Sequence, residues 1–163
     1  DLHSFPTRRS SDLTNVEKCV CSAAELDRYR RKLSGPILDR IDLQIAVPRL
    51  TPEELLSFSG GAESSAAIRS RVVRAREVQQ RRWAPFGLSC NAELPEKLVR
   101  RHLELSAESR DYLAGMAGRL KLSGRGISRV LKVARTIADL AGEPSIRTPH
   151  LAEALMYRQG NAP

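Results

Sequence analysis

One arginine, Arg40, is placed so that it could act on a group outside its own domain. It lies at the tip of the loop 34–40, directly before a short alternating run that ends at Pro48. A guanidinium carries a permanent charge and binds phosphate or carboxylate through a fixed fork of donors. The neighbouring residues Asp39 and Asp42 offer a simpler role, because either carboxylate could pair with Arg40. From the loop alone, the two interpretations are equally supported.

A second group of basic residues lies on the apolar-periodic run 122–140. Arg125 stands between two glycines near its start, where the absence of side chains allows the backbone to approach a ligand closely. Arg129 and Lys132 continue the same face, and Arg135 lies nearer the edge of the apolar stripe. A solvated basic face on an amphipathic helix is sufficient to explain Arg129, Lys132 and Arg135.

The cysteines and histidines do not form a recognisable site. Cys19 and Cys21 could supply two ligands of a tetrahedral zinc site, but such a site needs about four. Only Cys90 remains, and no histidine has a suitable spacing, so we expect free thiols and no metal site in this chain. His102 and His150 have no acid or nucleophile at a telling spacing, and we expect surface or packing roles. The odd number of cysteines favours a reducing compartment.

The element expected to hold Arg40 is a buried strand. Apolar side chains alternate with more polar ones through residues 41–47, which is the period of a strand. A capping box at 22–25 predicts a helix before the loop, and a second one at 51–54 predicts a short helix after the strand. Residues 57–62 are rich in serine and glycine and are expected to form a flexible connector.

From residue 64 onward, the pattern predicts only helices. Five are expected, at residues 65–83, 95–103, 106–120, 127–141 and from 148 onward. Ser65 is expected to cap the first, which is long and basic, and Gly142 to end the fourth. The apolar side chains expected to face the core include those of Ile68, Val72, Ala75, Leu151, Leu155 and Met156.

The composition is that of a basic protein of 163 residues with a formal net charge of +8. This balance favours polyanions as partners, whether nucleotide or nucleic acid, although charges spread along helices also suit a solvated surface. No apolar run approaches the roughly twenty residues of a membrane span. We therefore expect a cytoplasmic protein without a membrane partner. Trp83 is the one tryptophan, and no Phe or Tyr alternates with basic residues, so stacking on bases is not indicated.

Residues 1–13 are expected not to belong to the natural protein. Their sequence is the translation of one reading frame of a common short-read sequencing adapter, and a match over the whole segment leaves little room for chance. We exclude the segment from the fold, as a cloning scar would be excluded. Its charges cancel, since Arg8 and Arg9 balance Asp1 and Asp12. The natural chain is then expected to begin just after it, in the middle of a domain.

Two motifs in the same order give the chain a family resemblance. The sequence Leu38-Asp-Arg-Ile-Asp-Leu43 and the run 122–140 together resemble the end of a magnesium-chelatase-like AAA+ ATPase of the ComM/YifB group, and the resemblance extends from Cys19 to Arg158. It implies a mainly α-helical chain that is the C-terminal part of an AAA+ module. Its parts would be one helix and the last strand of the α/β core at 14–50, a short helix and linker at 51–63, and an α-helical lid bundle at 64–163.

The resemblance also implies roles for individual residues. Arg40 matches the arginine finger, which reaches across a subunit interface to the γ-phosphate held by a neighbour. Arg125 matches the sensor-2 arginine, which contacts the nucleotide of its own subunit, and Arg129 is a weaker candidate for binding the nucleotide. Cys19 and Cys21 match the second half of a cysteine-rich insertion. In the full-length protein the cofactors would be ATP and Mg²⁺, and the partners would be DNA and identical subunits in a hexamer-like ring.

The phosphate-binding loop G-x-x-x-x-G-K-[ST] is absent from this sequence. The backbone N–H groups, lysine and hydroxyl of such a loop hold the nucleotide phosphates and magnesium. We therefore expect this chain to be a piece of a longer ATPase that binds no ATP and has no ATPase activity by itself. The resemblance connects such proteins with DNA branch migration during natural transformation.

An alternative function is a free-standing DNA-binding module of the helix-turn-helix type. Its helices would be those at 106–120 and 127–141, joined by a turn at 121–126. The glycine-rich start of the second helix counts against this alternative, because base-reading side chains are expected there. A phosphate-binding loop upstream in the same reading frame would decide in favour of the ATPase.

Overall fold

A computed structural model describes the chain at residues 22, 24–25, 27–28, 40–45, 47, 50–56 and 63–158. The chain divides into two compact units, one made of Asp1–Ile41 and Val47–Ser59 and the other of Asp42–Ala46 and Gly60–Pro163. The second unit therefore combines the predicted lid helices with a short segment that closely follows Arg40 in sequence. The domain limits expected at 50 and 63 stay predictions.

The two capping boxes predicted in the first unit both lie at the start of helical residues. The Ser22 N–H donates to the Glu25 carboxylate at 2.9 Å, and the Glu25 N–H donates to the Ser22 hydroxyl at 3.4 Å, so the first capping box is formed. Residues 24–25 and 27–28 are helical, and the remainder of that predicted helix lies outside the described residues. α3 (Pro52–Leu56) begins at the predicted proline and is as short as expected.

The strand expected at 41–47 is not formed in the described residues 41–45 and 47, which corrects the prediction. The described residues of this run are irregular, and the apolar residues Ile45 and Val47 are 66% and 78% exposed. A strand exists only where its N–H and C=O groups pair with a neighbouring strand. The described part of the chain offers no such neighbour, since its single β-type contact is an isolated bridge between Leu105 and Ile146. The alternation is therefore present without the hydrogen-bonded ladder that would bury it.

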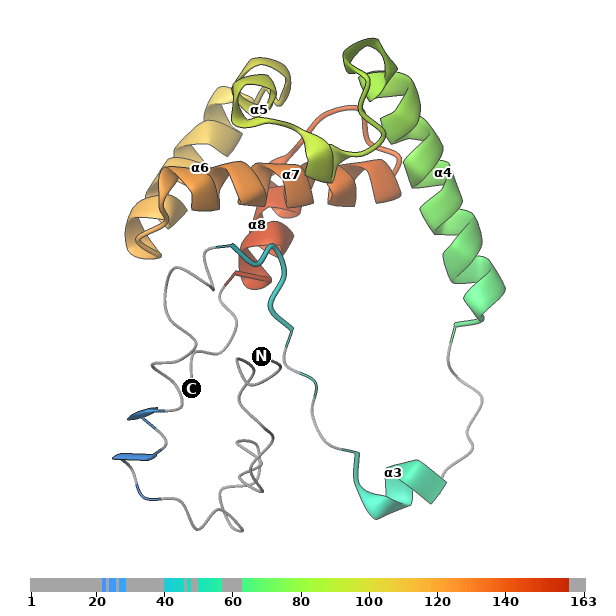
Figure 1. Cartoon of the computed structure of the whole chain (residues 1–163), viewed down its shortest axis with the longest axis vertical. Coiled ribbons are helices and arrows are strands. Elements are labelled where there is room, and N and C mark those ends of the chain that lie inside the picture. Colours follow the sequence, from blue (N-terminus) through green and yellow to red (C-terminus); the bar gives the residue numbers. More distant parts are fainter. Residues whose placement is uncertain are drawn as a thin grey trace, which may run out of the picture. The chain divides into compact units, whose positions relative to one another are not determined.

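The second unit is built from helices, as the sequence predicts. Its described residues form five α-helices and two short 3₁₀ turns: α4 (Ser65–Trp83), η2 (Ala84–Phe86), η3 (Asn91–Glu93), α5 (Glu96–His102), α6 (Ala107–Arg119), α7 (Gly124–Leu140) and α8 (Thr148–Met156). α7 is the central helix and contacts α4, η3, α5 and α8, while α6 packs against α8 (Figure 1). The mainly α-helical fold class is thereby confirmed.

Side-chain caps set the starts of these helices. The hydroxyl of Ser64 accepts a hydrogen bond from a backbone N–H of the first turn at 3.2 Å, so Ser64, and not the predicted Ser65, caps α4. Ser106 caps α6 and Ser123 caps α7 in the same way. Gly142 follows the end of α7 as predicted, and its φ of 74° lies in the left-handed region that glycine adopts without strain.

One hydrophobic core holds the helical unit together. It is formed by the buried side chains of Trp83, Leu94, Val99, Leu103, Leu113, Val130, Ala134, Ile146, Leu151, Ala154 and Leu155. The inward orientation predicted for Ala75, Leu151 and Leu155 is confirmed, because all three are buried. The core therefore draws on every helix from the C-terminal half of α4 to α8.

Three side chains that were expected to face the core are exposed instead. Ile68, Val72 and Met156 are 42%, 45% and 69% exposed. In α4, the buried residues all lie in the C-terminal half, from Ala75 to Trp83. The N-terminal half of α4 extends beyond α7, so its apolar face has no helix to pack against within the described unit (Figure 1).

Candidate functional site

Arg40 lies in a turn, and its side chain is exposed. Of its two possible acidic partners, Asp42 is bound elsewhere, because Oδ1 of Asp42 forms an ion pair with Nη1 of Arg129. Asp39 lies outside the described residues. Within the part of the chain that the structure describes, no hydrogen bond or ion pair of Arg40 is present. The pairing of Arg40 with Asp42, which the sequence left open, is therefore not formed.

Arg129 lies on α7 and is not the solvated residue that its position in the sequence suggested. Its side chain is 25% exposed, and a charge-assisted hydrogen bond joins it to the Asp42 carboxylate, which is 45% exposed. The Nε atom of Arg129 is buried and has no hydrogen-bond partner among the described residues. Water screens a partly buried pair less than a fully exposed one. The charge of Arg129 is thus balanced by a carboxylate of the same chain.

A backbone hydrogen bond provides a second attachment for the segment that contains Asp42. The Gln44 N–H donates to the Tyr157 carbonyl at 2.8 Å, directly after the end of α8. The segment is thereby joined to two helices, α7 through Asp42 and α8 through Gln44. The limit between the two compact units falls between Ile41 and Asp42, so Arg40 is separated from the attached segment by a single residue.

Arg125 lies in the first turn of α7 and is exposed. Ser123 fixes the start of this helix, since its hydroxyl accepts from the Gly126 N–H at 3.0 Å. No hydrogen bond or ion pair of Arg125 is found among the described residues, but its charge acts on Glu96. The pKa of Glu96 is lowered, chiefly by the hydrogen bond from Arg100 and with a smaller contribution from Arg125. The helix dipole adds positive potential, so this end of α7 favours an anionic group.

A buried ionic network joins α4, η3 and α7, and no motif in the sequence indicates it. The side chain of Asp139 is fully buried. It accepts hydrogen bonds from both Nη atoms of Arg82, at 2.6 and 2.9 Å, and from Nε of Arg135 at 3.1 Å. Asn91 donates to Asp139 at 2.9 Å and accepts from Nε1 of Trp83 at 2.8 Å. Each buried charge has a partner, which is the condition under which a core tolerates it.

The basic face of α7 is not simply solvated as expected, because Arg135 and Lys132 both bind other parts of the bundle. Arg135 is 4% exposed and also donates to two carbonyl oxygens of the loop that follows α7, at 2.6 and 2.9 Å. Burial lowers the pKa of Arg135, and the charge of Asp139 offsets part of this effect. Lys132 donates to the Ala92 carbonyl at 3.0 Å. Both residues therefore hold the bundle together. Only the i, i+4 spacing of Arg135 and Asp139 was visible in the sequence.

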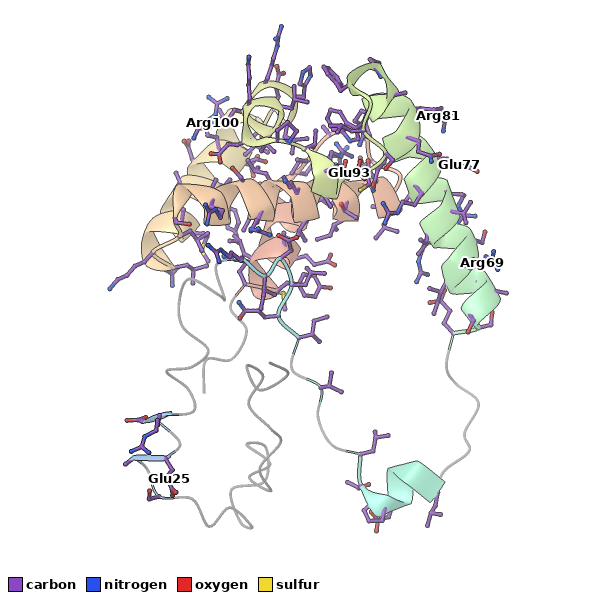
Figure 2. The ribbon with its side chains drawn as sticks, in the orientation of Figure 1. Glu25, Arg69, Glu77, Arg81, Glu93 and Arg100 are labelled. Atoms are coloured by element: carbon purple, nitrogen blue, oxygen red, sulfur yellow. The ribbon has the colours of Figure 1, made fainter. Side chains whose placement is uncertain are left out.

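The exposed surface of α4 is basic. The helix contains six arginines and one acidic residue, Glu77. Arg71 pairs with Glu63 at 2.6 Å, and Arg82 belongs to the buried network. The remaining four are exposed and have no ion pair among the described residues: Arg69, Arg74, Arg76 and Arg81. Figure 2 shows how Arg69 and Arg81 are distributed along the length of this helix.

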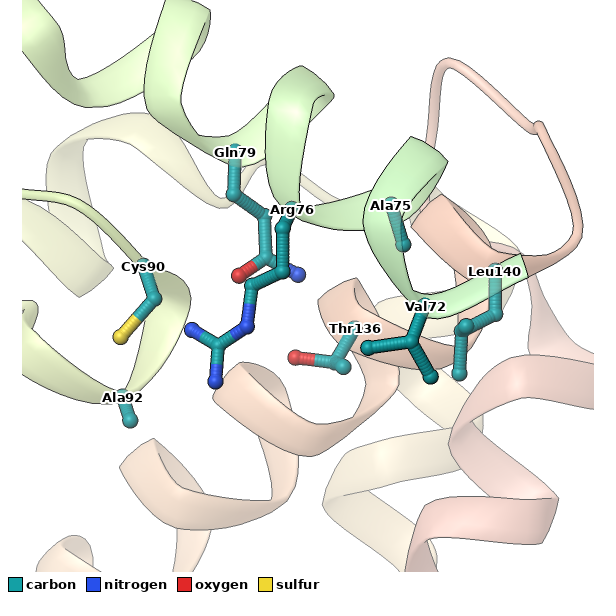
Figure 3. Close-up of a pocket in the computed structure, with 8 residues that line it drawn as sticks. All are labelled: Val72, Ala75, Arg76, Gln79, Cys90, Ala92, Thr136 and Leu140. Atoms are coloured by element: carbon teal, nitrogen blue, oxygen red, sulfur yellow. The ribbon is translucent and has the colours of Figure 1, made fainter. Parts of the chain in front are cut away.

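A hollow of about 260 Å³ lies between α4 and α7. Its walls include Val72 and Arg76 of α4, Thr136 and Leu140 of α7, and the free thiol of Cys90. The Arg76 guanidinium extends between Cys90 and Thr136 (Figure 3). The lining is largely apolar and holds no pair of groups that could act as general acid and base. The hollow is therefore not a candidate active site.

The remaining candidate ligands do not form a metal site in the described residues, where no three His, Cys, Asp or Glu side chains converge. Cys19 and Cys21 lie outside the described residues. His102 packs edge-on against Phe86 with the ring centroids 4.9 Å apart, and Nδ1 of His150 accepts a backbone N–H at the start of α8. Both histidines thus have the packing or surface roles expected. None of the helices described is both long and apolar enough to cross a membrane.

The helical unit and the loop that precedes it match one family along most of the chain. Residues 62–158 match the family described as magnesium chelatase, subunit ChlI C-terminal, and residues 5–55 match magnesium chelatase, subunit ChlI. The chain therefore belongs to the magnesium chelatase ChlI family. The match to residues 5–55 starts inside the segment 1–13, whose origin as a translated adapter stays a prediction.

The relatives identify the group within this family. The chain is 43% identical to the competence protein ComM of Haemophilus influenzae, over 84% of its own length and 26% of that protein. It is 41% identical to an uncharacterized protein of Mycobacterium tuberculosis over 90% of its length and 29% of the relative. It is 40% identical to the uncharacterized protein YifB of Escherichia coli over 85% and 26%. The resemblance to the ComM/YifB group is confirmed, and the chain spans less than a third of these relatives.

Proposed function

We propose that this chain contributes Arg40 and Arg125 to ATP hydrolysis in a ring-forming AAA+ ATPase that processes DNA. Membership of the magnesium chelatase ChlI family supports a protein that depends on ATP and Mg²⁺. Similarity to competence protein ComM supports a ComM-like role, which we propose to be DNA branch migration during transformation. In this proposal Arg40 acts on the nucleotide of a neighbouring subunit, and Arg125 acts on the nucleotide of its own subunit.

The observation that carries this proposal is the partner of Asp42. Because Arg129 holds the Asp42 carboxylate, Asp42 does not neutralise Arg40, whose side chain is exposed in its turn. An exposed guanidinium is available to a phosphoryl group brought by another subunit. In related nucleotidases, an arginine that stabilises the charge developing on the transferred phosphoryl oxygens accelerates turnover by roughly 10³–10⁵.

The residues of this chain fit one part of a nucleotide site. Arg125 is exposed at the positive end of α7, which suits a nucleotide phosphate. Arg129 fits less well, because its guanidinium already holds Asp42. When Mg²⁺ is bound with ATP, the ion neutralises charge on the phosphates. The sequence contains no phosphate-binding loop, so in this proposal other parts of the full-length protein hold most of the nucleotide.

The basic surface of α4 supports DNA as the polymer on which such a motor acts. Its four exposed arginines (Arg69, Arg74, Arg76 and Arg81) have no carboxylate partner among the described residues. Unpaired guanidinium groups along one helix suit a phosphate backbone, which is bound through charge and not through base sequence. In this proposal α4 contacts the DNA backbone without reading its sequence.

No observation favours the helix-turn-helix alternative. In such a module, the second helix must present one face to the major groove of DNA. The corresponding helix here is α7, which is the central helix of the bundle and contacts α4, η3, α5 and α8. Its first turn carries Gly124 and Gly126 beside Arg125, so few side chains there could read bases.

The role of Arg40 can be tested in the full-length protein. Arg40→Ala is expected to lower kcat for ATP by roughly 10³-fold or more while leaving nucleotide affinity almost unchanged, because the finger acts on the transition state in a neighbouring subunit. Steady-state ATPase assays and titration with a fluorescent nucleotide would measure the two effects. Arg119→Ala, which removes an exposed arginine at the end of α6, is the matched control and should change neither.

Mixing experiments distinguish a finger that acts in trans from a structural arginine. Subunits with Arg40→Ala, mixed with subunits whose phosphate-binding loop is inactivated, should regain part of the ATPase activity, since each supplies what the other lacks. An Arg40→Ala protein that hydrolyses ATP at the wild-type rate would show that the finger role is wrong.

A further inference from the structure

We propose that the Asp42–Arg129 ion pair links Arg40 to the lid helix α7, so that Arg129 positions the finger loop instead of binding the nucleotide. This inference rests on the proposed function of Arg40 and Arg125. It concerns a different step, namely how nucleotide binding in one subunit changes the position of the Arg40 that this subunit presents to its neighbour. Arg129 is then a positioning residue, because it acts through Asp42 and not on the phosphates.

Two independent contacts attach the segment 42–46 to the helical unit. The first is the ion pair between Oδ1 of Asp42 and Nη1 of Arg129, in which the arginine is the more buried partner. The second is the 2.8 Å hydrogen bond from the Gln44 N–H to the Tyr157 carbonyl. One of them involves α7 and the other the end of α8, so the segment is held at two points and follows the position of both helices.

The spacing along the chain places Arg40 within reach of this attachment. Arg40 and Asp42 are two residues apart, which corresponds to at most about 7 Å of extended backbone. The limit between the compact units falls between Ile41 and Asp42. Only Ile41 lies between Arg40 and the attached segment. We therefore expect a displacement of this segment to move Arg40 as well.

The same helix also carries the residue proposed to sense the nucleotide. Arg125 and Arg129 are four residues apart on α7, which is about one turn, or roughly 6 Å along the helix axis. Both belong to the continuous helix Gly124–Leu140, whose buried face is locked into the core. A rigid helix that moves when a nucleotide binds at Arg125 must therefore move Arg129 and the carboxylate it holds.

The inference can be tested with a double-mutant cycle in the full-length protein. Asp42→Asn and Arg129→Gln should each lower kcat for ATP, by less than the roughly 10³-fold expected for Arg40→Ala because the finger itself is retained, with little change in nucleotide affinity. The double variant should be no worse than either single variant, because both remove the same link. The charge-swapped protein, Asp42→Arg with Arg129→Asp, should recover part of the kcat that the single variants lack.

The Glu63–Arg71 pair supplies the matched control. It also lies in the helical unit, where it joins α4 to the residue just before its cap, and its side chains are 45% and 46% exposed. Glu63→Gln, Arg71→Gln and their charge swap should leave kcat unchanged. Thermal unfolding of all variants provides a readout other than activity. A genuine Asp42–Arg129 contact gives non-additive shifts in Tm, whereas a pair that is not formed gives additive ones.

Three results would overturn the link. Additive losses of kcat in the double variant would show that the two residues act separately. Failure of the charge swap, with Tm shifts that are also additive, would show that the pair is not formed. A loss of nucleotide affinity in Arg129→Gln but not in Asp42→Asn would make Arg129 a nucleotide ligand. Failure of the proposed function is distinct, since it appears as normal turnover in Arg40→Ala.

Discussion

The arginines of α7 differ in what balances their charge, although they lie on one helix. Arg125 faces solvent at the helix start, Arg129 holds a partly exposed carboxylate, and Arg135 is enclosed by Asp139 and backbone carbonyls. The energetic consequences of removing each side chain therefore differ. Loss of Arg135 would remove one partner of a buried carboxylate and so lower stability. Loss of Arg125 would mainly lower the positive charge available to an anion at the start of α7.

Arg125→Ala is expected to weaken the discrimination between ATP and ADP in the full-length protein. A guanidinium that contacts the outermost phosphate contributes more to ATP than to ADP, so affinity for ATP should fall by more than affinity for ADP. Nucleotide titrations would measure the ratio of the two dissociation constants, with Arg119→Ala as the control. An unchanged ratio in Arg125→Ala would mean that Arg125 is only a solvated residue.

Asp139→Ala is expected to destabilise the helical unit strongly. The substitution leaves Arg82 and Arg135 without the carboxylate that they share, and breaking a buried ion pair from one side costs about 3–5 kcal/mol. Urea denaturation of the chain would give the change in the free energy of unfolding. Glu96→Ala, which breaks the exposed pair with Arg100, is the control and should cause little change. Equal stability of the two variants would contradict a stabilising role for the network.

At the level of elements, the helices were predictable because their signals are local. Apolar spacing of three and four residues, serine caps and a glycine after the helix end all act within one or two turns. The five helices of the second unit and the capping box at Ser22 were therefore found with small errors, such as Ser65 in place of Ser64 as the cap of α4.

The features that were missed depend on distant partners. The alternation at 41–47 indicates a strand, but a strand also needs a neighbour, which the described residues do not supply. Periodicity identified the apolar face of α4, but it could not show that α7 covers only the C-terminal half of that face. The burial of Arg135 depends on Arg82 and Asn91, which come from other elements. In the candidate site, Arg40 and Arg125 were proposed from motifs and stay predictions, and no motif indicated the contact of Arg129 with Asp42.

Two glycines provide a test of how α7 ends. An added Cβ would meet no atom within 4 Å at either Gly142 or Gly115, so steric space does not distinguish the two sites. Gly142→Ala should destabilise by about 1–2 kcal/mol, because its positive φ is strained for an L-residue. Gly115→Ala, within α6, should stabilise by about 0.5–1 kcal/mol through helix propensity. Chemical denaturation measures both changes, and a stabilising Gly142→Ala would rule out the left-handed ending.

At the level of the whole molecule, the excess of positive charge is unevenly balanced. Four exposed arginines of α4 (Arg69, Arg74, Arg76 and Arg81) have no acidic partner in the described part of the chain, whereas Arg71, Arg100 and Arg147 each pair with a glutamate. The net charge of the whole chain is +8. An excess of positive charge strengthens the long-range attraction of a polyanion.

Replacing Arg69, Arg74, Arg76 and Arg81 by Gln should weaken DNA binding by the full-length protein and make it less dependent on salt. The slope of log K against log salt should become shallower by roughly 0.7–0.9 for each DNA phosphate that the variant no longer neutralises. Fluorescence anisotropy over a salt series would measure the slope. A control in which the exposed Arg101 and Arg110 are replaced by Gln should leave it nearly unchanged. An equal effect of both sets would indicate a general charge effect with no defined surface.

During folding, residues 42–46 must find a surface that does not exist until the helices have assembled. Asp42 and Arg129 are 87 residues apart in the sequence, and closing so long a loop costs entropy before any favourable interaction forms. We therefore expect this segment to dock late in folding and to detach early when the protein opens locally. The contacts of Asp42 and Gln44 form only once α7 and α8 are in place. In the motor proposed above, a subunit with an unfinished lid would then lack the attachment that positions Arg40, so completion of the lid would come before the finger acts.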